Sequence, residues 1–127
     1  MSHMRYVRWA ITLAYAGFIF YLSSRQWSGT SLFPFSDKVL HLVLYFGLGG
    51  LTLWALRMTK LKGKGSIGYI AFIFVALYGL SDEFHQLFVP GREFSLFDLL
   101  ADAAGAALGI ATAAWLATVK VKQKVLI

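Results

Sequence analysis

The chain has 127 residues, of which 58% are hydrophobic and 14% are charged, and its mean hydropathy is +0.65. Soluble domains carry roughly 25% charged residues, so this composition excludes an ordinary soluble domain and indicates an integral membrane protein. The formal net charge of +6 is carried by basic residues beside apolar segments, which favours membrane topology over nucleic-acid binding as its cause.

Four apolar segments are each close to the ~20 residues that a helix needs to cross a bilayer core of about 30 Å. In chain order they cover residues 6–22, 39–56, 65–84 and 98–119. The first segment has no small-residue cleavage site, so we expect a span and not a signal peptide. The opening Met1-Ser2-His3 is interpreted as a cloning remnant, which leaves residues 4–127 as one transmembrane domain. The predicted fold class is an all-α membrane protein with four transmembrane helices.

The distribution of charge predicts the orientation of these helices. Three of the regions that border the segments carry basic residues without acidic ones: Arg5, Arg8, Arg57, Lys60, Lys62, Lys64, Lys120, Lys122 and Lys124. The other two connections carry the remaining basic residues together with all six acids. An excess of Lys and Arg marks the cytoplasmic side, so both termini are expected inside and the two acidic connections outside.

The stretch YGLSDEFHQLFVPGREFSLFDLLAD, residues 78–102, holds five of the six acids. At ~1.5 Å of rise per residue, each of the four segments is expected to place a polar residue at a similar height, roughly 24–27 Å above the cytoplasmic boundary: Ser24, His41, Asp82 and Asp102. Ionisable groups at membrane depth are costly and usually face a bundle interior or a wet cavity. The sequence therefore predicts a polar pocket near the outer leaflet.

Spacing along each segment places the polar side chains on common helix faces, because residues four apart lie one above the other. The stripes are Asp37–His41–Tyr45 in the second segment, Tyr78–Asp82–Gln86 in the third with His85 beside it, and Asp98–Asp102 in the fourth. Gly105 and Gly109 continue the last stripe within a row of small residues. Such rows let helices approach closely, so both glycines are expected to be packing residues.

Four motifs follow one another from Ser23 to Gly109: SS, then DKxxHxxxY (37–45), YGxxDEFHQxFVPGR (78–92) and DxxADxxGxxxG (98–109). Together they resemble the VanZ-like family of small membrane proteins, which is named for low-level resistance to the lipoglycopeptide teicoplanin. The resemblance implies a bacterial plasma-membrane protein that acts at the outer face on antibiotic, wall precursor or lipid. The positions that match the family's motif residues are Asp37, His41, Glu83, Gln86, Arg92, Asp98, Asp102, Gly105 and Gly109. Position 102 is aspartate where the family pattern commonly has asparagine.

Two classes of function remain open from the sequence. In the first, the protein is a hydrolase or group transferase that acts on an amphipathic substrate. Glu83 or Asp82 would be the general acid or base, and His41 or His85 a second proton carrier. The expected ligand-binding residues are Arg92, Gln86, Asp98, Asp102, Asp37, Lys38 and Tyr45, with Arg92 able to fork onto a carboxylate or a phosphate. In the second, the protein is a non-catalytic lipid- or antibiotic-binding module whose charge cluster is mainly structural.

Cofactors and partners are constrained only loosely. The chain has no cysteine, which excludes thiolate metal sites, and no cofactor is required by the sequence. A metal variant of the enzyme hypothesis uses His41, Glu83, His85 and an aspartate, but the H-E-x-x-H spacing is absent. The expected partners are membrane lipids and a lipid-linked wall precursor or lipoglycopeptide, with no nucleic acid. The glycine row permits a homo-oligomer.

Overall fold

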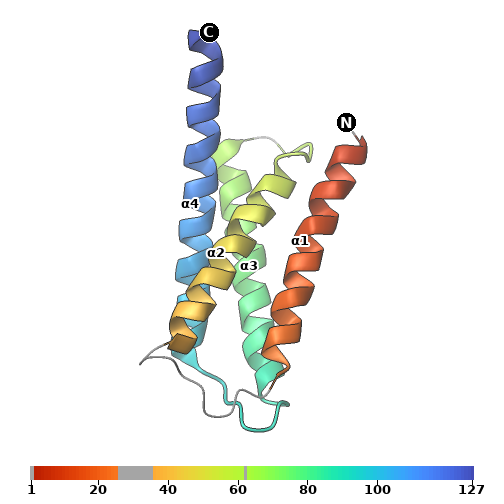
Figure 1. Ribbon diagram of the computed structural model, residues 1–127, viewed down its shortest axis with the longest axis vertical. Coiled ribbons are helices and arrows are strands. Elements are labelled where there is room, and N and C mark those ends of the chain that lie inside the picture. Colours follow the sequence, from red (N-terminus) through yellow and green to blue (C-terminus); the bar gives the residue numbers. More distant parts are fainter. Residues whose placement is uncertain (1, 26–35, 62) are drawn as a thin grey trace.

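The computed structural model describes residues 2–25, 36–61 and 63–127, which form four helices. They are α1 (Ser2–Ser23), α2 (Ser36–Leu56), α3 (Lys64–Gln86) and α4 (Leu96–Leu126), as Figure 1 shows. The prediction of an all-helical fold is confirmed for these residues. Met1 and Lys62, which entered the sequence interpretation, lie outside the described part of the chain.

Three of the four helices are long and apolar enough to cross a membrane, over Asp37–Leu56, Gly65–Gln86 and Leu96–Leu126. The chain is therefore a multi-pass membrane protein. The first predicted span, 6–22, lies within α1, which does not belong to these three. All four helices are longer than the predicted spans, because the helical backbone continues through flanking polar residues. The clearest case is α4, which passes three lysines beyond residue 119 and ends at Leu126.

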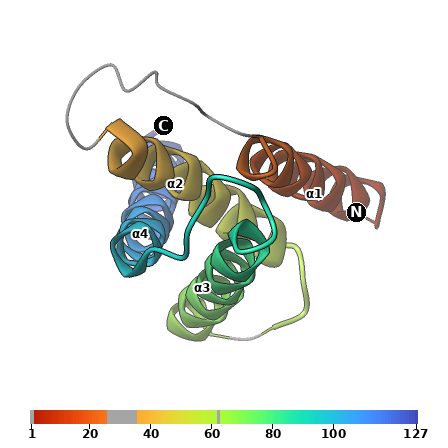
Figure 2. The same ribbon diagram turned by 90° about the horizontal axis from the view of Figure 1, so that it is seen from below.

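The helices pass side by side, with both termini at one end of the bundle (Figure 1). The connection between α2 and α3 lies at this same end, which we call the basic end. The opposite end, where α2 begins, α3 ends and α4 begins, is called the acidic end. Seen along the bundle, α1 and α4 lie on different sides of α2 and α3 (Figure 2). Among the described residues α2 packs against all three other helices, whereas α1 packs against α2 and α3 only.

The closest approach is between α2 and α4, at the small residues of α4. A Cβ atom added to Gly105 would overlap the carbonyl oxygen of Leu42, and one added to Gly109 would overlap that of Phe46. On the α2 side, a Cβ at Gly49 would overlap the backbone of Ala106. Backbone therefore lies directly on backbone at this interface, which only residues without a side chain permit.

Two apolar clusters fill the space between the helices. One contains Ile19, Tyr45, Leu48, Val75 and Ala106. The other contains Leu53, Leu56, Ile67 and Ala71. Many large apolar side chains remain exposed, including Phe18, Phe74 and Leu108. Soluble monomers rarely expose so many large apolar side chains, so this surface suits a lipid environment.

Candidate functional site

Four carboxylates are buried at the acidic end of the bundle. Asp82 and Glu83 come from the last turns of α3, and Asp98 and Asp102 from the first turns of α4. Their exposed fractions are 4%, 0%, 6% and 0%, so none of the four is solvated. With His41 of α2 they form what we call the acid–histidine cluster. The structure therefore brings together five of the predicted site residues, from three helices.

His41 lies between the two carboxylates of α4. Its Nδ1 is 2.7 Å from Oδ1 of Asp102, and its Nε2 is 3.8 Å from Oδ2 of Asp98. The imidazole also stacks on the ring of Tyr45, one turn along α2, with the ring centroids 6.4 Å apart. The contact with Asp102 fixes the ring plane and joins α2 to α4.

Lys38 connects the cluster to the surface. Its Nζ lies 3.0 Å from Oδ1 of Asp98 and 2.5 Å from Oδ2 of Asp37. The Asp37 side chain is 59% exposed, so this predicted ligand-binding residue stands outside the buried cluster. Among the described residues, Lys38 is the cation that contacts the buried acids.

A pair of tyrosines separates the cluster from the apolar interior. The Tyr45 hydroxyl donates a hydrogen bond to Oδ2 of Asp82 at 3.3 Å, and its ring lies 6.2 Å from that of Tyr78. The Tyr78 hydroxyl donates to the carbonyl oxygen of Ala16 in α1 at 2.5 Å. Each ring packs as a core aromatic while its polar tip is satisfied.

Glu83 is held by the start of α4. Its Oε2 accepts a hydrogen bond from the backbone N–H of Ser95 at 2.9 Å. The Ser95 hydroxyl in turn caps α4 by accepting from the N–H of Asp98 at 3.2 Å. The connection between α3 and α4 is thus tied back onto the cluster.

Several buried oxygens of the cluster accept no hydrogen bond from the described residues. They are Oδ1 of Asp82, Oε1 of Glu83 and Oδ2 of Asp102, while Oδ1 of Asp98 has only the charge contact with Lys38. A buried polar atom without a partner costs free energy, and a buried carboxylate more so. The cluster therefore has acceptor capacity and negative charge that this part of the chain does not use.

Two predicted residues at the end of α3 turn towards α1 instead. Nε2 of His85 lies 2.9 Å from Oγ of Ser24, and its ring stacks on Phe20 with centroids 4.5 Å apart. Gln86, 1% exposed, donates a hydrogen bond to Oγ of Ser23 at 3.4 Å. The structure thus separates His85 from Glu83, because residues two apart on a helix project about 200° apart.

Arg92 makes no ion pair with a carboxylate among the residues that the structure describes. It follows Gly91, whose φ of +80° is a left-handed conformation that glycine adopts without strain. The backbone N–H of Arg92 closes this turn on the carbonyl of Val89 at 3.1 Å. Arg92 is half-buried, and among the described residues it is Lys38 that makes the contact with Asp98.

Two residues at the site were missed by the sequence interpretation. Ser95 was detectable, since a Ser three residues before an Asp at the start of an apolar run is a helix-start signature. Gly79 is the second: a Cβ there would lie 3.1 Å from Oδ2 of Asp102 and 3.2 Å from Cε1 of Tyr45. Gly79 stands in the motif of residues 78–92, but its neighbours come from two other helices, so the local sequence could not show its role at the site.

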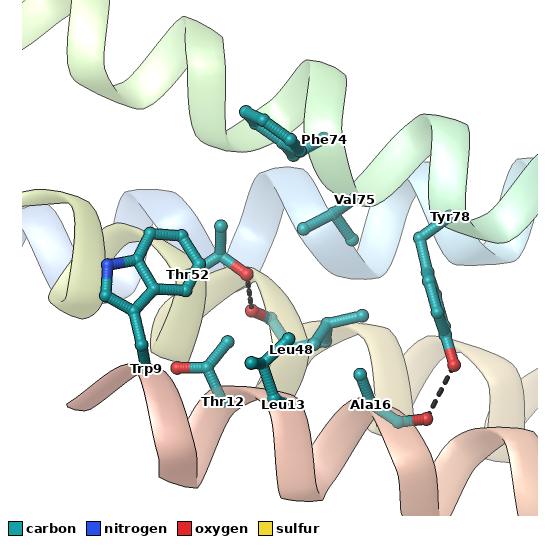
Figure 3. A pocket seen from close by; sticks show the side chains of 9 residues that line it. All are labelled: Trp9, Thr12, Leu13, Ala16, Leu48, Thr52, Phe74, Val75 and Tyr78. Carbon is teal, nitrogen blue, oxygen red and sulfur yellow. Dashed lines mark hydrogen bonds between the residues drawn. The ribbon is translucent and has the colours of Figure 1, made fainter. Parts of the chain in front are cut away.

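An apolar cavity of about 120 Å³ lies between α1, α2 and α3 (Figure 3). It is lined by Trp9, Thr12, Leu13, Ala16, Leu48, Thr52, Phe74, Val75 and Tyr78. Tyr78 connects this cavity to the cluster, because its ring neighbours Tyr45, which contacts Asp82. The cavity is distinct from the polar pocket that the sequence predicts, since its lining is almost wholly apolar.

Comparison with known proteins gives one match. The family model described as VanZ/LLP1 matches residues 7–117, which is most of the chain. No curated protein and no solved structure matches.

Proposed function

The chain belongs to the VanZ/LLP1 family, and on this premise we propose that it binds a lipid-linked or lipophilic ligand of the cell envelope at the acid–histidine cluster. The observation that carries this proposal is the set of buried carboxylate oxygens without a hydrogen-bond partner among the described residues. Ionisable groups in a membrane protein are expensive to bury and mark sites of binding or transport by default. An unused acceptor at the centre of such a group favours an external partner.

The proposal places the acidic end at the outer face of a bacterial plasma membrane. Basic residues without acidic neighbours flank the other end, including Arg57 and Lys60 after α2 and Lys120 in the last part of α4. This excess assigns the basic end to the cytoplasm. Both termini are then cytoplasmic, and α1 must cross the membrane as a fourth span.

Labelling of single cysteines tests this orientation, because the chain has no cysteine of its own. We expect a membrane-impermeant maleimide to label Arg25→Cys and Glu93→Cys in intact cells. Ser2→Cys and Lys122→Cys should be labelled only after the cells are made permeable. Labelling of Lys122→Cys in intact cells contradicts the orientation, and labelling of Ser2→Cys alone shows that α1 does not cross.

The ligand is amphipathic in this account. Carboxylate oxygens without a hydrogen-bond partner among the described residues suit a cationic group. Lys38 and Arg92, whose guanidinium pairs with no described carboxylate, suit a phosphate or carboxylate. A lipid tail is the occupant that we assign to the apolar cavity, because the helices around it are embedded in acyl chains and Tyr78 joins it to the cluster. The family resemblance adds wall precursor and teicoplanin as ligands, and so a role in lipoglycopeptide resistance.

A second candidate function is purely structural. The contacts between His41 and Asp102, Lys38 and Asp98, and Ser95 and Glu83 join the starts of α2 and α4 to the end of α3. Such a network would hold the helices together without any ligand, as buried charges often do. The two candidates differ in what a neutral residue at position 83 does.

Native mass spectrometry of the detergent-purified protein separates the two. The variants are Glu83→Gln, which keeps an acceptor for the Ser95 N–H, and Glu93→Gln, which removes the same charge from an exposed position. We expect a lipid or precursor mass bound to wild type and Glu93→Gln, reduced by about tenfold or more in Glu83→Gln because a charged hydrogen bond is lost.

The same spectra distinguish binding from turnover. A chemically processed species present with wild type and Glu93→Gln, but not with Glu83→Gln, identifies a hydrolase or group transferase. An unprocessed ligand bound to wild type and to Glu93→Gln identifies a binding module. Equal occupancy in all three proteins, or none in any, contradicts the proposed function and leaves the structural candidate.

A further inference from the structure

We propose that the acid–histidine cluster holds one divalent transition-metal ion, ligated by His41, Glu83 and Asp102. This deepens the proposed function and rests on its claim that the cluster is a binding site, because it names the occupant at the centre of that site. Zn²⁺ is the ion to test first.

The geometry brings the three ligands together from three different helices. One ligand atom of each residue lies within 4.8 Å of those of the other two. Two ligands at 2.0–2.2 Å from one ion are at most about 4.4 Å apart, so small side-chain rotations are enough to place all three on it. His41 comes from α2, Glu83 from α3 and Asp102 from α4, so an ion here would join the three helices at the acidic end.

A second observation points to a ligand independently of the clustering. Glu83 and Asp102 are both 0% exposed, and each has one carboxylate oxygen without a hydrogen-bond partner among the described residues. Buried carboxylates are normally paired with cations or coordinate metals. Within the described part of the chain, each of the two forms one polar contact through its other oxygen, with the Ser95 N–H for Glu83 and with the His41 ring for Asp102.

The charge of the cluster favours the same conclusion. Among the described residues, Lys38 is the one Lys or Arg side chain in contact with the four buried carboxylates, which gives the cluster a formal net charge of −3 when all four are ionised and His41 is neutral. A divalent ion lowers this to −1 without any further side chain. Lys38 also contacts the exposed Asp37, so its positive charge neutralises only part of the negative charge of the cluster.

The donor types select the class of ion. Mg²⁺ and Ca²⁺ prefer oxygen ligands alone, whereas imidazole nitrogen with carboxylate oxygen suits Zn²⁺, Mn²⁺ or Fe²⁺. Three protein ligands leave a coordination position open, as in metal sites that take a substrate or water. An anionic headgroup that also contacts Arg92 could fill that position.

The contact between His41 and Asp102 is compatible with ligation by both residues. Their atoms Nδ1 and Oδ1 lie 2.7 Å apart, so an ion would take the place of the proton between them after a small side-chain rotation. Nε2 of the ring would then keep a carboxylate neighbour, Asp98 at 3.8 Å, as metal-ligating histidines often do.

The test measures metal retained by the intact, detergent-purified chain after chelation, reloading with Zn²⁺ and removal of free ion. All proteins carry His3→Ala, so that this exposed histidine cannot contribute a ligand. We expect one Zn²⁺ per chain in the wild-type background and in the matched control Glu93→Gln. Glu83→Gln and Asp102→Asn should each retain at least about tenfold less.

A thermal unfolding scan accompanies the metal analysis, so the inference does not depend on variants that fold poorly. Zn²⁺ should raise the unfolding temperature of the wild-type background and of Glu93→Gln, because an ion that binds only the folded state stabilises it. No retained Zn²⁺ and no such rise in the wild-type background overturns the inference, as does full retention by Glu83→Gln.

Lipid content is read from the same preparations, which keeps the two proposals distinguishable. A lipid or precursor bound by a chain that retains no metal overturns the metal site and supports the proposed function. Retained metal with no lipid mass in any preparation supports the metal site and contradicts the proposed function.

Discussion

His41→Leu is expected to lower the free energy of unfolding by about 3–5 kcal/mol, the order of cost when a buried carboxylate loses its partner. The substitution leaves Asp102, which is fully buried, without its contact at 2.7 Å, and takes a neighbour from Asp98 as well. Leucine offers no donor to either carboxylate. Chemical or SDS-induced unfolding of the detergent-purified protein measures the loss.

The double variant His41→Leu/Asp102→Asn provides the control for this interpretation. Because asparagine removes the buried charge, the double variant should be more stable than His41→Leu alone. Asp102→Asn by itself is expected to cost less than His41→Leu, since a neutral amide is cheaper to bury than an unpaired carboxylate. Simple addition of the two single losses would show that His41 and Asp102 do not stabilise the fold as a pair.

Gly109→Ala is expected to destabilise the bundle by roughly 1–3 kcal/mol or more, although it adds a single methyl group. The new Cβ would overlap the carbonyl oxygen of Phe46, and backbone atoms cannot move aside as the end of a flexible side chain can. Helices α2 and α4 must therefore separate, which also disturbs the contact of His41 with Asp102 one to two turns away. The unfolding assay used for His41 measures this effect.

Gly17→Ala is the matched control, because it makes the same change in the exposed part of α1. A Cβ at Gly17 would meet nothing within 4 Å. Alanine favours a helix over glycine by about 0.5–1 kcal/mol, so this variant should lose no stability. Equal losses of unfolding free energy in Gly109→Ala and Gly17→Ala would show that the close approach of α2 and α4 does not require glycine at position 109.

Much of the fold followed from the sequence, because the signals were long and repetitive. Apolar segments of nearly membrane-spanning length predicted four helices, and counting from their basic ends placed Asp82, Asp102 and His41 at a common height. The structure does bring these three to one end of the bundle. The weakest prediction is the first span, residues 6–22, because α1 is not one of the three helices that length and hydropathy support.

The composition of the cluster was harder to predict, because height along a helix says nothing about rotation between helices. Glu83 and His85 are two residues apart and project to nearly opposite sides of α3, so the structure groups Glu83 with His41 and Asp102 and places His85 beside Ser24. The spacing alone could have shown that Glu83 and His85 diverge. The position of Asp102 in this group depends on the rotation of α4 relative to α2. The close backbone contacts at Gly105 and Gly109 set that rotation.

The choice of cation at the cluster was also beyond sequence reasoning. Both Lys38 and Arg92 flank the acidic segments, and arginine can donate two parallel hydrogen bonds to one carboxylate, which lysine cannot. Lys38 nevertheless makes the contact with Asp98, since it lies in the first turn of α2, which packs beside the start of α4. Arg92 follows a glycine turn whose direction only the folded chain defines.

The measurement that tests the central claim most directly is ligand occupancy and unfolding free energy, determined together on wild type and Glu83→Gln. A binding site predicts that the variant loses the bound lipid or precursor mass. It also predicts that, once metal and ligand are removed from both proteins, the variant is no less stable than wild type, because the substitution removes a buried charge without an ion-pair partner among the described residues and keeps the acceptor for the Ser95 N–H. A variant that unfolds several kcal/mol more easily while its occupancy stays unchanged would contradict the account, and would make the cluster a structural network of the bundle.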